Sequence, residues 1–104
     1  MRAVTSVRRT PAMSDLPSVV ESGVTRFGSL LWEAFFLPKG TSEPVVAQWR
    51  AATVKVLREP GVIKQLADYG LEIVGSTPQQ LVERVRADIV MYADIIKKAN
   101  IVAD

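Results

Sequence analysis

A long amphipathic segment near the C-terminus is the feature that most restricts what this chain can fold into. Residues 77–80 read Thr-Pro-Gln-Gln, a capping box with proline at the first helical position. One apolar face then continues for about six turns; it consists of Leu81, Val82, Val85, Ile89, Tyr92, Ile95, Ile96 and Ala99. The pattern predicts a helix from Pro78 to Ala99 that ends at Asn100. Such a helix needs a sheet or other helices to cover its apolar face.

Two further helices are predicted upstream. Residues 41–44, Thr-Ser-Glu-Pro, supply a hydroxyl cap, an acid and a proline, the usual start of a helix. Apolar residues then recur at helical spacing as far as Leu57, and residues 58–61, Arg-Glu-Pro-Gly, end the run. A short second helix is expected from Val62 to Tyr69, with Gly70 just beyond its end.

Three segments have the composition of strands. These are residues 3–7, the apolar run 29–37 that Pro38 halts, and residues 71–74 between two glycines. Between the first two, residues 11–17 are expected to form a loop and residues 18–22 one helical turn closed by Gly23. The order of strands and helices predicts an α/β fold with short strands and amphipathic helices. Trp32 and Trp49 are expected to pack in its core rather than to form a stacking surface.

The 104 residues include no cysteine and no histidine. This excludes thiol nucleophiles, disulfides, imidazole bases and metal sites built on Cys or His. Carboxylate, lysine, hydroxyl or tyrosine chemistry is left, and no pair of such residues is marked by its spacing. We therefore expect no enzyme, no cofactor and no bound metal.

The net charge of +2 lies entirely within the first 26 residues, which contain four arginines and only two acidic residues, Asp15 and Glu21. So weak a field gives no argument for nucleic acid as a partner. No apolar stretch reaches the roughly 20 residues of a spanning helix. No segment has the pattern of a signal peptide, so the sequence as written is expected to stay in the cytoplasm.

Four stretches in order along the chain resemble one receptor family, the solute-binding receptors of tripartite tricarboxylate transporters, also called the Bordetella uptake gene family. The similar stretches are Ala3-Val4-Thr5-Ser6 with Arg9-Thr10-Pro11 and residues 15–23, then residues 32–41, then residues 66–78, and finally Ile95-Ile96-Lys97-Lys98-Ala99-Asn100-Ile101. No single stretch is decisive, but together they cover nearly the whole chain.

The resemblance implies a C-terminal fragment of a type II periplasmic-binding-protein fold with two lobes, since family members are about three times as long. Residues 1–104 would then form one partial domain. Residues 1–28 would supply a strand and loop of the second lobe, and residues 29–104 a crossover strand and the C-terminal helices. Family members are periplasmic, bind small carboxylates and deliver them to membrane transporter subunits.

The resemblance also points to ligand-binding positions: Thr5 and Ser6 in the turn after the first strand, Arg9, and the loop from Asp15 to Ser18. Hydroxyls and free N–H groups in such turns can hold a carboxylate. A structural role is equally physical, because Asp15 and Ser18 are typical caps of a short turn. Arg9 suits a bidentate carboxylate contact, but a solvated or interdomain charge is the more common role of such an arginine.

The leading hypothesis is thus the C-terminal part of a carboxylate receptor that binds its ligand only weakly by itself. The alternative is a stand-alone, self-associating interaction protein derived from such a receptor. In either case apolar helix and strand faces are left without cover, and we expect a homo-oligomer.

Overall fold

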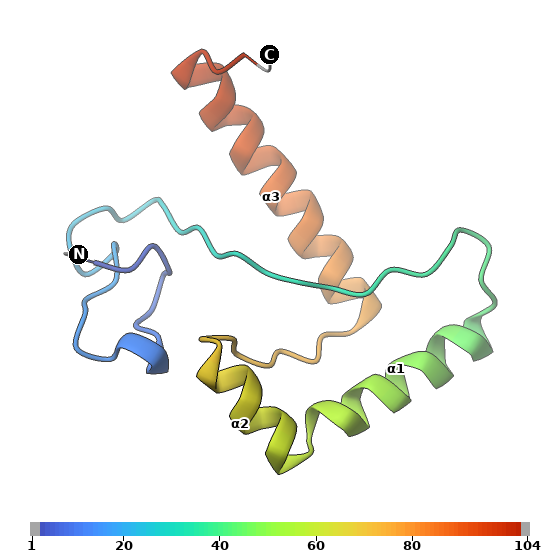
Figure 1. Cartoon of the computed structure of the whole chain (residues 1–104). Coiled ribbons are helices and arrows are strands. Elements are labelled where there is room, and N and C mark those ends of the chain that lie inside the picture. Colours follow the sequence, from blue (N-terminus) through green and yellow to red (C-terminus); the bar gives the residue numbers. More distant parts are fainter. Residues whose placement is uncertain (1–2, 103–104) are drawn as a thin grey trace. The chain divides into compact units, whose positions relative to one another are not determined.

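The computed structural model describes residues 3–102. They form two compact units, the first ending at residue 73 and the second beginning at residue 74. The first unit contains a 3₁₀ turn, η1 (Pro11–Met13), and two helices, α1 (Glu43–Leu57) and α2 (Pro60–Asp68). The second unit is built on one helix, α3 (Pro78–Ala99). Figure 1 shows these elements along the chain.

Helix α3 has the bounds that its sequence predicts, and its capping box is formed in full. The Thr77 Oγ1 accepts a hydrogen bond from the Gln80 N–H at 3.2 Å, and the Gln80 Oε1 accepts one from the Thr77 N–H at 2.9 Å. At the other end, Asn100 adopts the left-handed conformation with φ 49°. Both ends of α3 are therefore defined by side chains and backbone of its own segment.

Helices α1 and α2 contact each other and meet at a corner made by Arg58 and Glu59 (Figure 1). The predicted start of α1 is confirmed, with Ser42 at the N-cap position. Helix α2 begins at Pro60, two residues earlier than predicted, because proline is well suited to the first helical position. It ends at Asp68, one residue earlier than predicted, with Tyr69 as the C-cap residue and Gly70 just beyond it at φ 75°.

The three predicted strands do not form among residues 3–102. Val4 makes an isolated parallel bridge with Ser18, while residues 29–37 and 71–74 form no strand ladder in the part of the chain that the structure describes. A strand exists only through hydrogen bonds to a neighbour, which composition cannot supply. The expected loop at residues 11–17 contains the short turn η1, and the turn at residues 18–22 is present, followed by Gly23 with φ 99°.

No hydrophobic side chain is buried among residues 3–102, and Ser18 is the only residue of that range with a fully buried side chain. The predicted core position of Trp49 is wrong for this chain, since the residue is 50% exposed. Its ring meets Phe35 edge to face, with centroids 6.4 Å apart. Trp32 is half-buried. The apolar faces are thus formed as predicted, but they are not covered.

Candidate functional site

The candidate ligand-binding residues lie in one loop region of the first unit, closed by the bridge between Val4 and Ser18. The Val4 N–H donates to the Pro17 carbonyl and the Val4 carbonyl accepts from the Val19 N–H, both at 2.9 Å. These two bonds hold the N-terminal segment beside the start of the turn at residues 18–22. The intervening residues 5–17 form a closed loop around this bridge.

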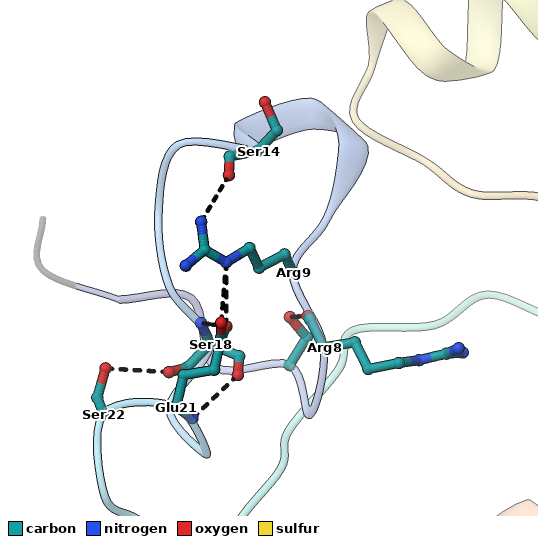
Figure 2. A network of polar contacts seen from close by, with 7 residues as sticks. Arg8, Arg9, Ser14, Ser18, Glu21 and Ser22 are labelled. Atoms are coloured by element: carbon teal, nitrogen blue, oxygen red, sulfur yellow. Dashed lines mark hydrogen bonds and ion pairs between the residues drawn. The ribbon is translucent and has the colours of Figure 1, made fainter.

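Ser18 begins its turn with a reciprocal cap. Its N–H donates to the Glu21 Oε2 at 2.8 Å, and its Oγ accepts from the Glu21 N–H at 3.2 Å. Its carbonyl accepts from the Ser22 hydroxyl at 3.0 Å (Figure 2). Because Ser18 is fully buried, its hydroxyl stabilises the turn and is shielded from solvent.

Arg9 lies against the same carboxylate. Its Nε is 3.0 Å from the Glu21 Oε1 and 3.2 Å from Oε2, and its Nη1 donates to the Ser14 carbonyl at 3.2 Å. The two side chains of this ion pair are about half exposed. Figure 2 shows Arg9 between the Ser14 carbonyl and the Glu21 carboxylate, whereas the neighbouring Arg8 side chain points away.

The hydrogen bond from the Ser18 N–H and, after it, the bond from Arg9 lower the pKa of Glu21 below its ordinary value of 4.5. Glu21 therefore remains ionised at neutral pH as the common acceptor for Ser18 and Arg9. Sequence reasoning missed this residue. The spacing Ser18-Val19-Val20-Glu21 is itself a capping box and was the available signal.

The other three candidates lie around this cluster. Thr5 is exposed, and its carbonyl accepts from the Ser29 N–H at 2.9 Å. The half-buried Ser6 donates its hydroxyl to the Arg8 carbonyl at 2.5 Å. Asp15 is exposed and forms no hydrogen bond or ion pair with residues 3–102. The region thus brings hydroxyl groups, one free carboxylate and one paired guanidinium to a single loop.

A second feature of the first unit is an apolar groove with a volume of about 300 Å³. Its lining consists of Phe35, Trp49, Ala52, Thr53, Val56 and Leu57. We call it the α1 groove. It combines one face of α1 with Phe35. Phe35 belongs to the extended segment before α1, which Figure 1 draws as a long irregular trace.

Within residues 3–102, no group of His, Cys, Asp or Glu side chains is arranged to hold a metal ion. None of the helices described there is both long enough and apolar enough to cross a membrane.

Comparison with known proteins relates the chain to bacterial binding receptors. A family described as "Tripartite tricarboxylate transporter family receptor" matches residues 1–101. A UPF0065 protein of Agrobacterium vitis is 31% identical over 101 residues, which are 94% of this chain and 29% of that protein. A UPF0065 protein of Pseudomonas knackmussii is 33% identical over 79 residues, 75% of this chain and 47% of that protein.

A solved structure, that of the periplasmic binding protein BugD, is similar with a TM-score of 0.77 and 32% sequence identity. The match covers 94% of this chain and 33% of BugD. The chain therefore spans about a third of the length of that receptor. This confirms the expected fold, that of a part of a periplasmic binding receptor. By the match over residues 1–101, the chain belongs to the tripartite tricarboxylate transporter receptor family.

Proposed function

We propose that residues 1–104 are the C-terminal portion of a periplasmic solute-binding receptor for small carboxylates, which delivers its ligand to membrane transporter subunits. The family match over residues 1–101 carries the proposal. In the complete receptor, two lobes close around the anion. Residues 1–28 contribute a strand and loop to one lobe, and residues 29–104 contribute the crossover strand and C-terminal helices.

The five predicted site residues take two roles in this proposal. The hydroxyl groups of Thr5 and Ser6 contact the ligand carboxylate, and the exposed Asp15 suits the ammonium group of an acidic amino acid. Arg9 and Ser18 act by positioning. Ser18 is fully buried and Arg9 is paired with Glu21, so both hold the loop that presents the other three residues.

By itself the chain binds no carboxylate tightly. Ligand sites usually bury about 70–90% of a small molecule's surface. Thr5 and Asp15 are exposed, so a ligand at this loop would keep much of its surface in water. The second wall of the cleft belongs to the remaining part of the receptor.

A chimera tests the proposal. It joins residues 1–104 to the part of the Agrobacterium vitis relative that this chain does not match. Calorimetric titration with succinate and with glutamate is expected to show binding to the chimera and none to residues 1–104 alone. Thr5→Ala and Ser6→Ala should weaken binding by about tenfold each, as expected for one lost hydrogen bond. Thr25→Ala, an exposed threonine outside the candidate site, is the control. A folded chimera that binds neither compound would refute the proposal.

One observation favours a second candidate, a self-associating interaction protein. Because residues 3–102 bury no hydrophobic side chain, a second copy would cover the same apolar faces around a two-fold axis. Light scattering on a size-exclusion column, over about a hundredfold range of concentration, should then give a mass above 11.4 kDa. A well-folded monomer at every concentration would exclude this candidate.

A further inference from the structure

Thr10 uses its hydroxyl differently from most threonines at its position in a turn. It is the N-cap residue of η1, where a threonine side chain usually accepts a hydrogen bond from its own turn, but it forms no such cap. Instead, its Oγ1 donates to the Oε1 of Glu72, 62 positions later in the chain, at 3.0 Å. The bond thus links the candidate loop to the last residues of the first unit.

Both partners of this bond are held in place by their own backbone. Pro11 restricts the preceding Thr10 to an extended conformation, and Thr10 has φ −98° and ψ 141°. Glu72 comes two residues after Gly70, whose left-handed conformation (φ 75°) is part of the turn that closes α2. The hydrogen bond therefore joins two segments whose local directions are already determined, and it holds η1 to the end of α2.

The link acts on η1 and on the exposed carboxylate that follows this turn. The Met13 N–H donates to the Thr10 carbonyl at 3.1 Å and so closes η1, and Asp15 follows two residues later. Thr5, in contrast, comes directly after Val4 and its bridge, so its place does not depend on η1. Loss of the link should therefore displace Asp15 and leave Thr5 where it is.

We propose that Glu72 is a positioning residue of the candidate site. Through Thr10 it holds η1, and with it Asp15, in the orientation that receives the ammonium group of an acidic amino acid. The inference rests on the proposed function, in which Asp15 contacts that group, whereas Glu72 touches no ligand itself. Its hydrogen bond therefore favours the binding of glutamate and has no effect on succinate, which carries no ammonium group for Asp15 to bind.

The first test needs no ligand: amide hydrogen exchange of Met13, measured by NMR in residues 1–104, reports the closure of η1. Thr10→Val and Glu72→Ala should each speed this exchange by about two- to tenfold, the effect of one net hydrogen bond. The double variant should exchange no faster than either single variant, because both remove the same bond. Thr10→Ser and Glu72→Gln keep a donor and an acceptor, so they should exchange like the unmodified chain. Glu83→Ala, at an exposed glutamate of α3, is the control and should have no effect.

Three outcomes of this measurement would overturn the proposal. They are an unprotected Met13 amide in the unmodified chain, equal exchange in all variants, and effects of Thr10→Val and Glu72→Ala that add in the double variant.

The second test measures ligand preference in the chimera described above. Glu72→Ala should weaken glutamate binding by about two- to tenfold and change succinate binding by less than about twofold, whereas Glu72→Gln should keep the preference of the parent chimera. An unchanged ratio of the two affinities, or a chimera that binds only succinate, would overturn the proposal. A folded chimera that binds neither compound refutes the proposed function instead, and the exchange measurement still decides whether Glu72 holds η1.

Discussion

Glu21 is the residue on which the candidate loop depends. Its carboxylate accepts hydrogen bonds from the Ser18 N–H and from the Arg9 Nε, two groups that belong to different parts of the loop. Charge-assisted bonds of this kind are shorter and stronger than neutral ones. Because the ion pair is half exposed, its main effect is to fix geometry rather than to stabilise the whole chain.

The first prediction concerns the pH dependence of this cluster. The pKa of Glu21 is lowered in the folded loop, so the ionised carboxylate stabilises the loop above pH 4.5, and this contribution is lost as the pH falls through the lowered value. The amide resonance of Ser18, followed by NMR, should titrate with a midpoint below 4.5. Arg9→Gln should move the midpoint upward.

Arg8→Gln is the matched control, because the Arg8 side chain points away from Glu21 (Figure 2). It should leave the midpoint unchanged. A midpoint of 4.5 or higher in the unmodified chain would contradict the hydrogen-bond arrangement described for Glu21.

The position of the candidate loop was predictable from the sequence, but the roles of its residues were not. A serine that caps a turn and a serine that binds a ligand cannot be distinguished by residue type or by the residues beside them in the sequence. Ser18 is assigned to the cap by Glu21, which follows three residues later, and by its complete burial. Arg9 was expected to be solvated, interdomain or ligand-bound; its ion pair with Glu21 depends on a loop closure that no local pattern encodes.

Among the elements, helices were predictable and strands were not. The ends of α3 are determined by Thr77, Gln80 and Asn100, all within the segment itself. Residues 29–37 have the composition of a buried strand, but they form no strand ladder within residues 3–102. The hydrogen bonds of a helix are local, whereas a strand requires hydrogen bonds to a second segment. No strand ladder forms among residues 3–102.

The second prediction concerns the end of α2. Gly70 has φ 75°, and the N–H of Leu71 donates to the Leu66 carbonyl at 2.9 Å, a Schellman arrangement. Gly70→Ala should destabilise the helix end by about 1–2 kcal/mol, because residues with a Cβ disfavour this conformation. Amide hydrogen exchange across α2 measures the change.

Gly61→Ala is the control for the second prediction, since an added Cβ at either glycine meets nothing within 4 Å and Gly61 is not left-handed. It should stabilise α2 by about 0.4–1 kcal/mol. Equal loss of protection in both variants would show that the left-handed conformation is not what ends the helix.

For the whole molecule, the exposed apolar surface predicts weak cooperativity. Residues 3–102 bury no hydrophobic side chain, so unfolding of the isolated chain exposes little additional apolar surface. At low concentration, scanning calorimetry should give a broad transition with a heat-capacity change well below the roughly 1.2–1.5 kcal/mol/K of a 100-residue domain. A sharp transition with the full heat-capacity change would contradict the uncovered faces.

The exposed segment from Leu30 to Leu37 has a consequence for solubility. Glu33 is its single charge, and it contains no proline until Pro38. Short stretches with high strand propensity, low charge and no proline are those from which amyloid-like stacking begins. Glu33 is exposed and interrupts this run, while Pro38 and Lys39 close it. We therefore expect Glu33 to act as an aggregation gatekeeper, whose benefit falls in the interval between synthesis and assembly, when the segment has no partner strand.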